Sequence, residues 1–461
     1  MRRRAFLARS LPAAGMALCA LTGAAAVDGC EAAGRRRSAT RPRPTARECV
    51  PHAGGARQLR GTWIGSFKNL DWPSRPGLPA SHQRDELAEL LDTAARLRLN
   101  AVLLQVRPTA DALYRSGYEP WSKWLTGAQG EPPGYDPLEF AVGAAHSRGL
   151  ELHAWFNPFR VSEQPDLRRL AAAHPARRNP DWVVEYGGEL WYDPGNPAVR
   201  ALALRVVADV ARRYDIDGVH LDDYFYPYPV AGQAFDDQAT FRRHGGGFGS
   251  RADWRRSNVN LLIAGAATRV RRIRPWASFG VSPFGIWRNA SADPAGSRTA
   301  GLQAYDDLYA DALTWIHRGW LDYIAPQLYW EISDPAAPYA ELARWWSRAA
   351  SASATELYLG QAAYRAGAWH DPDELPRHLA VDRTQPAVSG EVFFHARSLL
   401  AGGLRRRLAL GEFARPAYPP VPQLVRRRLA AATSAPPAGW LRREAIAQCP
   451  DRHLKQAPGD G

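Results

Sequence analysis

The segment DGVHLDDYFYP (residues 217–227) is a short alternating run that ends in two adjacent acids and a cluster of aromatic residues. Seven further short runs of β-branched and aromatic residues are spaced along the chain, at 61–67, 101–106, 150–156, 277–281, 323–328, 357–360 and 391–394. Between them lie stretches with the apolar period of a helix, at 84–97, 199–214, 254–272, 306–315 and 339–349. Eight strands that alternate with helices predict a TIM-like (β/α)8 barrel of the α/β class over residues 57–420.

A doubly wound parallel sheet is the alternative architecture. It is less favoured because no Gly-rich phosphate turn follows the first expected strand. The connections that leave the expected strands are long and rich in Trp, Tyr, Pro and Gly, notably at 108–135, 158–195 and 224–250. Active sites of β/α barrels lie in these outgoing loops. The loop lengths therefore predict a long groove, which suits a polymer.

The net charge of +13 on 461 residues is concentrated in the two ends of the chain. Residues 1–49 and 403–461 each carry +7, which leaves the body between them at −1. A nucleic-acid-binding protein is expected to carry a basic stripe across its body, so nucleic acid is not the expected partner. The triple-Arg runs at 405–407 and 426–428 are interpreted as solvated helix faces or as contacts with an anionic envelope surface.

The chain contains 17 tryptophans, and several stand beside Pro, Gly or Asp in expected loops. The plainer interpretation is that they fill the core, because large aromatic rings bury well. An apolar face with a polar edge also suits a sugar ring, so the composition hints at a carbohydrate ligand.

The N-terminal segment, residues 1–30, is predicted to be an export signal. A basic start at Arg2–Arg4 precedes a stretch of small and apolar residues that runs to about Val27. The Arg-Arg-x-Phe-Leu element resembles a twin-arginine signal, and Ala24-x-Ala26 would suit an ordinary signal peptidase. Cys30 is the alternative cleavage point, as the lipidated Cys of a lipoprotein anchored to the membrane. We therefore expect export across the inner membrane to the periplasm or cell envelope.

The regions that flank the barrel are interpreted from their composition. Residues 31–56 are rich in Gly, Arg, Pro, Ser and Thr and are expected to form a flexible tether, and 421–461 form a basic C-terminal extension. Cys49 and Cys449 could pair as one disulfide between the two ends or remain two free thiols.

Side-chain alternation along the strands predicts which residues reach the barrel mouth. His220 and Asp222 share one face of their strand, and Asp223 begins the loop. Cleavage of a glycosidic bond requires two carboxyl groups, one to protonate the leaving oxygen and one to act as nucleophile or base. Asp222 with Glu331 is the preferred pair and Asp223 with Glu331 the second.

Other chemistries are less well supported by the residues. His220 and Asp222 together with His153 could hold a divalent metal, as in a metal-dependent deacetylase, but no tight His/Asp cluster accompanies them. No Gly-x-Ser-x-Gly elbow is present for serine chemistry. No metal or cofactor is expected.

Several long strings resemble the glycosyl-hydrolase-like family 10, bacterial envelope proteins with a β/α barrel. They include RGTW (60–63), NLDWPS (69–74), QVRP (105–108), DALY (111–114), PWS (120–122), LTG (125–127), HAWFNP (153–158), DGVHLDDYFYP (217–227), GVSPFGIWRN (280–289) and IAPQLYW (324–330). The match covers about 57–420 in the expected order.

The resemblance implies a glycoside hydrolase that cleaves glycan strands of peptidoglycan, especially strands stripped of their stem peptides. It also implies Asp222 and Asp223 as the leading catalytic residues, with Glu331 carried over from the string that follows IAPQLYW. Relatives are often lipoproteins, which adds to the case for Cys30.

We therefore expect an exported glycoside hydrolase whose strand ends and loops bind and orient the sugar. The expected sugar-binding residues are Gln105, Arg107, Trp121, His153, Trp155, Asn157, His220, Tyr224, Ser282, Trp287, Arg288, Gln327, Tyr329 and Trp330. Two rival hypotheses remain: a barrel that binds carbohydrate without cleaving it, and a metal-dependent polysaccharide deacetylase.

Overall fold

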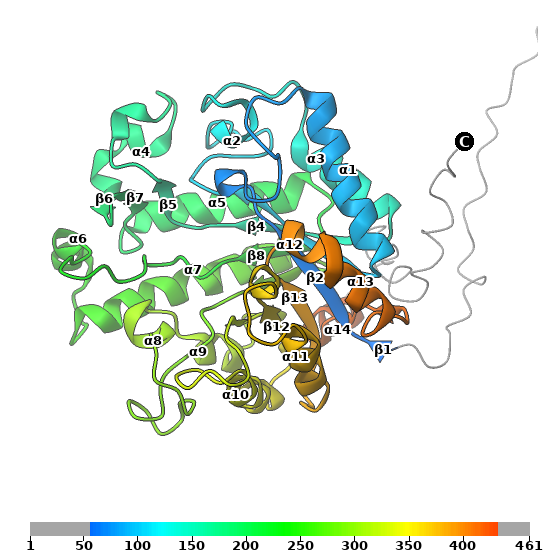
Figure 1. The fold of residues 1–461 in the computed structure, drawn as a ribbon. Coiled ribbons are helices and arrows are strands. Elements are labelled where there is room, and N and C mark those ends of the chain that lie inside the picture. Colours follow the sequence, from blue (N-terminus) through cyan, green and yellow to red (C-terminus); the bar gives the residue numbers. More distant parts are fainter. Residues whose placement is uncertain (1–55, 432–461) are drawn as a thin grey trace, which may run out of the picture. The chain divides into compact units, whose positions relative to one another are not determined.

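A computed structural model describes residues 56–431. The export signal, Cys30, Cys49, Cys449 and most of the expected tether lie outside the described residues. Within them, the predicted eight-stranded parallel barrel is confirmed (Figure 1). Its strands, in chain order, are β2 (Leu59–Ile64), β3 (Ala101–Arg107), β4 (Glu151–Phe156), β8 (Gly218–Leu221), β9 (Ser278–Val281), β10 (Tyr323–Ile324) with β11 (Gln327–Leu328), β12 (Glu356–Gln361) and β13 (Val388–Phe393).

The barrel closes because every strand pairs in parallel with the next, and β13 returns to pair with β2. The sixth strand is split. β10 pairs with β9 and β12. After a gap of two residues, β11 pairs with β12 again. Pro326 lies in the gap, where its missing N–H cannot donate to the ladder.

Helices surround the strands (Figure 1). The principal ones are α1 (Ala80–Arg96), α3 (Pro137–Ser147), α5 (Pro197–Arg213), α7 (Arg251–Ile273), α9 (Ala312–His317), α10 (Tyr339–Ser351), α11 (Glu374–Arg383), α12 (Ala396–Leu400) and α13 (Gly402–Leu410). Their starts follow from local chemistry. Asp136 and Asn196 accept backbone N–H groups at the first turns of α3 and α5, and Pro follows each of them.

The long outgoing loops carry small elements of their own. After β3 comes α2 (Lys123–Thr126), and after β4 come α4 (Pro175–Arg178) and an antiparallel sheet of β5 (Arg160–Ser162), β6 (Val183–Tyr186) and β7 (Glu189–Tyr192). After β8 comes α6 (Gln238–His244), and α8 (Ala304–Asp307) follows β9. Short 3-10 turns lie at Phe67–Asn69, Leu167–Arg169, Pro180–Trp182 and Ala363–Arg365.

The last described residues pack against the start of the described region and against the segment before β10. β14 (Ala417–Tyr418) pairs in parallel with β1 (Ala56–Arg57), and α14 (Gln423–Ala430) follows. Arg428 on α14 ion-pairs with buried Asp322 at 2.6 Å, just before β10. The expectation that the whole run 426–428 is solvated was therefore wrong for Arg428, because it neutralises a carboxylate that the barrel buries.

The barrel interior is filled by large rings. Trp63, Trp155, Tyr323 and Tyr358 form a core cluster there with smaller apolar residues. Glycines make room for these rings: a Cβ added at Gly280 would lie 2.2 Å from the Tyr323 ring. A second and larger apolar layer packs between the strands and the helices.

Candidate active site

A cavity of about 330 Å³ lies at the carboxyl ends of the barrel strands. Its lining comes from all eight barrel strands and the loops that follow them: Trp63, Phe67, Leu70, Gln105, Trp155, Arg160, Asp222, Asp223, Tyr224, Tyr228, Ser282, Gln327, Tyr329, Tyr364 and Phe394. This is the position at which β/α barrels carry their active sites. Its charged lining residues are one arginine and two aspartates.

Asp222 and Asp223 both face this cavity although they are adjacent in the chain. Strand β8 ends at Leu221, so the alternation of side chains no longer applies beyond that residue. Trp155 Nε1 and Asn157 Nδ2 both donate to Asp222 Oδ2, at 3.0 and 3.1 Å. The Tyr228 hydroxyl donates to Asp223 Oδ2. Both carboxyls are buried and held in fixed orientations.

The two carboxyls differ in acidity because of their surroundings. Burial and the neighbouring Asp223 raise the pKa of Asp222 to about 7. Burial also raises the pKa of Asp223, but hydrogen bonds from Tyr228 and Gln327 oppose that shift. The raised pKa makes Asp222 the candidate proton donor of the pair near neutral pH.

Below the cavity floor, hydrogen bonds link five buried side chains. Trp63 Nε1 donates to His220 Nε2 at 3.1 Å, and an indole N–H is only ever a donor. His220 therefore carries its proton on Nδ1 and donates to the Tyr323 hydroxyl at 3.0 Å. The Tyr323 hydroxyl also lies 2.8 Å from His153 Nδ1, and His153 Nε2 lies 3.2 Å from Glu151 Oε2. The Trp63 contact thus sets the tautomer of His220 within this hydrogen-bonded network.

Loss of the central hydroxyl from this chain is expected to destabilise the protein. Tyr323→Phe would remove the hydroxyl that His220 Nδ1 and His153 Nδ1 both contact in the buried interior. We expect the free energy of unfolding to fall by about 1–3 kcal/mol, measured by urea denaturation. Tyr118→Phe, at an exposed tyrosine, is the control and should leave the unfolding midpoint unchanged. An equal unfolding midpoint for Tyr323→Phe and wild type would mean that these hydrogen bonds contribute no net stability.

The structure brings eight of the predicted site residues to the cavity. They are Asp222, Asp223, Gln105, Trp155, Tyr224, Ser282, Gln327 and Tyr329. Asn157 lies just behind, where its amide holds Asp222. His153 and His220 lie on the predicted face but deeper in the barrel, in the hydrogen-bonded chain below the floor. We interpret these three as positioning residues and not as sugar ligands.

Arg107 does not reach the cavity, contrary to the sequence-based expectation. A register irregularity between Gln105 and Arg107 in the β3–β4 pairing breaks the alternation. Arg107 instead pairs with Glu119, with Nε 2.8 Å from Oε2, and donates to the carbonyls of Asn157 and Pro158. It ties together the loops after β3 and β4.

Glu331 is not brought together with the aspartates. Strand β11 ends at Leu328, so the shared face expected for Gln327, Tyr329 and Glu331 does not extend to Glu331. Its carboxylate accepts the backbone N–H of His370 at 3.1 Å, away from the residues that line the cavity. The geometry therefore pairs Asp222 with Asp223 and not with Glu331.

The remaining predicted sugar-binding residues also lie outside the cavity lining. Trp287 stacks on Trp345, with centroids 5.9 Å apart, and Arg288 ion-pairs with Asp306 and Asp293. Trp330 packs edge-on against Phe284. Trp121 forms a bridge with Ala112 inside the loop after β3. These three tryptophans pack between loops, in line with the interpretation that large aromatic rings here fill the core.

Seven lining residues were missed by the sequence analysis: Trp63, Phe67, Leu70, Arg160, Tyr228, Tyr364 and Phe394. Trp63 lies on β2, and alternation on that strand could have found it. The others lie beyond their strand ends, where chain direction depends on tertiary packing. Tyr329 and Phe394, from different loops, stack at 5.9 Å and together form an apolar wall.

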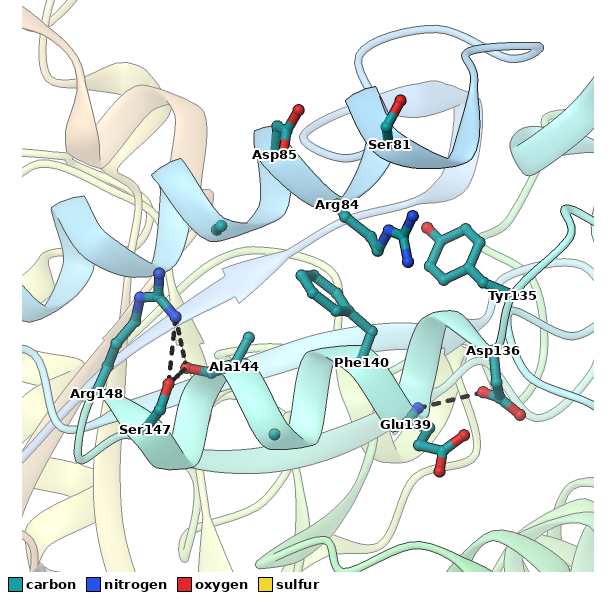
Figure 2. Close-up of a pocket in the computed structure, with 12 residues that line it drawn as sticks. Ser81, Arg84, Asp85, Tyr135, Asp136, Glu139, Phe140, Ala144, Ser147 and Arg148 are labelled. Carbon is teal, nitrogen blue, oxygen red and sulfur yellow. Dashed lines mark hydrogen bonds between the residues drawn. The ribbon is translucent and has the colours of Figure 1, made fainter. Parts of the chain in front are cut away.

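A larger cavity of about 870 Å³ lies outside the barrel, between α1 and α3. Figure 2 shows the side chains that line it and the hydrogen bonds of Arg148 to Ala144 and Ser147. Asp136, one of the carboxylates that line it, caps α3 by accepting the backbone N–H of Glu139. We find no paired buried carboxyls among its lining residues, so it does not compete with the strand-end cavity as a catalytic site.

Two features of the described residues bear on other functions. Between residues 56 and 431, no group of three or more His, Cys, Asp or Glu is placed to hold a metal ion. No helix in that same range has the length and apolar character needed to span a membrane.

Comparisons with known proteins show the family of this chain. Residues 58–374 match the family described as Glycosyl hydrolase-like 10. The chain is 46% identical over 385 residues to glycosyl hydrolase YngK of Bacillus subtilis (strain 168), covering 81% of this chain and 75% of that protein. It is 41% identical over 362 residues to glycosyl hydrolase DigH of Escherichia coli (strain K12), covering 73% of this chain and 82% of DigH.

Among solved structures, the catalytic domain of a β-amylase from Paenibacillus polymyxa is similar in fold. It has a TM-score of 0.50 at 9% identity and covers 77% of this chain and 97% of that one. This likeness concerns the barrel alone.

Proposed function

Because the chain belongs to the glycosyl hydrolase-like 10 family, we propose that it cleaves the glycan strands of peptidoglycan with Asp222 and Asp223 as its catalytic carboxyls. The observation that carries the proposal is the pair itself: two buried carboxyls, one of them holding a proton near neutral pH, in a strand-end cavity walled by aromatic rings. The choice of peptidoglycan rests on the sequence resemblance and on the expected export signal.

The proposed reaction assigns a different role to each carboxyl. Asp222 donates its proton to the glycosidic oxygen as the bond to the leaving sugar breaks. Asp223, as a carboxylate, stabilises the positive charge that develops at the anomeric carbon. A water molecule then forms the new bond to that carbon and gives a proton to the Asp222 carboxylate, which restores the acid. Trp155 and Asn157 hold Asp222 in position throughout, because both donate to the same carboxyl oxygen.

The fragments released from peptide-free peptidoglycan test this proposal. Residues 48–461 would be incubated with strands from which an amidase has removed the stem peptides, and the soluble products identified by mass spectrometry. Oligosaccharides with a new reducing end support hydrolysis. Binding to the glycan with no product would support a carbohydrate-binding barrel. Release of acetate that a chelator abolishes would support a deacetylase.

The activity is expected to fall as the pH rises through about 7. The pKa of Asp222 is raised to about 7 in the folded protein, so its proton is present below that pH and lost above it. Since the proposed acid must be protonated, kcat/KM should decrease about tenfold per pH unit on the alkaline side. Initial rates between pH 5 and 9 would measure this limb. A rate that stays constant up to pH 9 would contradict the role given to Asp222.

A further inference from the structure

Arg160 is the cationic residue that lines the catalytic cavity, and its environment is unusual. It begins β5, three residues after Asn157, and its residue is only 6% exposed. Three aromatic rings surround the guanidinium: Cζ lies 4.5 Å from the centroid of Phe67, 5.1 Å from Trp191 and 4.1 Å from Tyr224. These contacts hold the guanidinium at the cavity wall.

This buried cation has unused hydrogen-bonding capacity. Arg160 Nε is buried and has no hydrogen-bond partner among the described residues. The nearest carboxylate oxygen, on Glu189, lies 3.6 Å from Nε, beyond hydrogen-bond distance, and the Glu189 side chain is 27% exposed. Leaving a buried donor unpaired is costly, which indicates that a ligand supplies the missing acceptor.

The charges that line the cavity indicate what kind of ligand fits. Its charged residues are Arg160, Asp222 and Asp223. With one proton on the aspartate pair, the lining carries one positive and one negative charge. A carboxylate on the substrate would meet an arginine fork, whose donor geometry matches a carboxylate. Because Arg160 packs on Tyr224, next to the aspartates, that carboxylate would belong to a sugar within the cavity.

We propose that Arg160 binds a carboxylate carried by the sugar in the catalytic cavity, namely the lactyl carboxylate of a muramoyl residue in peptidoglycan. This inference rests on the proposed function for its choice of sugar. A stem peptide converts the same carboxylate into an amide, which is neutral and bulkier. Arg160 would therefore let this site distinguish peptide-free strands from peptide-bearing ones.

Binding measurements in a variant that does not turn over test the contact. In an Asp222→Asn background, Kd would be measured by calorimetry for peptide-free oligosaccharides with free carboxylates and for the same oligosaccharides converted to methylamides. We expect the free form to bind about 10- to 100-fold more tightly, as for a charge-assisted hydrogen bond. Adding Arg160→Gln should reduce that preference to about twofold or less. Arg160→Lys, which keeps the charge but loses the fork, should retain part of it.

Arg256 offers a matched control. It also stacks on an aromatic ring, with Cζ 4.1 Å from the Tyr305 centroid, but it lies on α7 away from the cavity. Arg256→Gln should keep the full preference for the free carboxylate. A preference that persists in Arg160→Gln, or that is absent when Arg160 is intact, would overturn the proposal.

Further measurements distinguish this inference from a different carboxylate ligand and from the proposed function itself. If Arg160-dependent binding were found for hyaluronan oligosaccharides, which carry a uronate, but not for peptide-free peptidoglycan, the lactyl assignment would be wrong. If the parent protein cleaved peptidoglycan without any carboxylate preference, the proposed function would stand and this inference would fail. If the preference were found but no bond were cleaved, the inference would stand and the proposed function would fail.

Discussion

Asp222→Asn is expected to lower kcat on peptide-free peptidoglycan by about 10²- to 10⁴-fold, the usual contribution of a general acid. The amide has nearly the same shape as the carboxyl, and its oxygen can still accept from Trp155 and Asn157. The fold should therefore be retained. Asp223→Asn should cause a comparable loss, because the developing positive charge would lose its carboxylate. Product release followed by mass spectrometry, with circular dichroism as the test of folding, would measure both effects.

Glu331→Gln tests which carboxyl is the partner of Asp222. The structure brings Asp223 beside it, whereas the sequence favoured Glu331. Glu331 accepts a loop N–H from His370 and lies outside the cavity lining, so this variant should keep most of the parent activity. Equal losses in Asp222→Asn and Glu331→Gln would return Glu331 to the catalytic pair. Full activity in Asp222→Asn would remove Asp222 from it.

Arg107→Met is expected to lower the free energy of unfolding by about 3–5 kcal/mol, the cost of leaving a buried charge without its partner. Arg107 and Glu119 are both almost fully buried, and two further bonds from Arg107 reach the carbonyls of Asn157 and Pro158. The loops after β3 and β4 would lose the hydrogen bonds through which Arg107 joins them. Urea denaturation followed by tryptophan fluorescence would measure the loss.

The surface pair Asp166–Arg168 offers the control for this measurement. Both groups face solvent, so Arg168→Met should leave the unfolding midpoint where it is in the parent. The double variant Arg107→Met/Glu119→Leu should recover part of the stability, because no charge remains buried. If Arg107→Met unfolded like the parent but lost affinity for glycan, the original sugar-binding assignment of Arg107 would be right.

Strand periodicity carried most of the fold prediction. Eight short runs separated by helical patterns are enough to specify a barrel, because few architectures bury eight parallel strands. The boundaries were less accurate. The first strand was expected at 61–67 and lies at Leu59–Ile64, and the sixth is interrupted at Pro326. The exact ends of a strand depend on which residues of the neighbouring strands pair with it, and the sequence of the strand alone does not give that pairing.

The prediction of which side chains reach the barrel mouth agrees with the structure where a side chain lies on a regular strand near its carboxyl end, as for Gln105 and Trp155. It placed His153 and His220 on the correct face but could not give their depth, which depends on how the barrel interior is filled. It failed for Arg107 because an irregularity in pairing reverses the face. Arg160 was out of reach, because its position depends on rings from separate loops that meet only in the fold.

The tautomer of His220 determines what the cavity floor offers to a ligand. His220 Nε2 carries no hydrogen, so the Ser282 hydroxyl, 2.9 Å away, can only donate to it, and it shares the single lone pair of that nitrogen with the Trp63 N–H. The outward side of the Ser282 hydroxyl then presents only lone pairs. A sugar hydroxyl above Ser282 can contact it only by giving a hydrogen, and a fluorine in that place, which has none to give, would find no partner there.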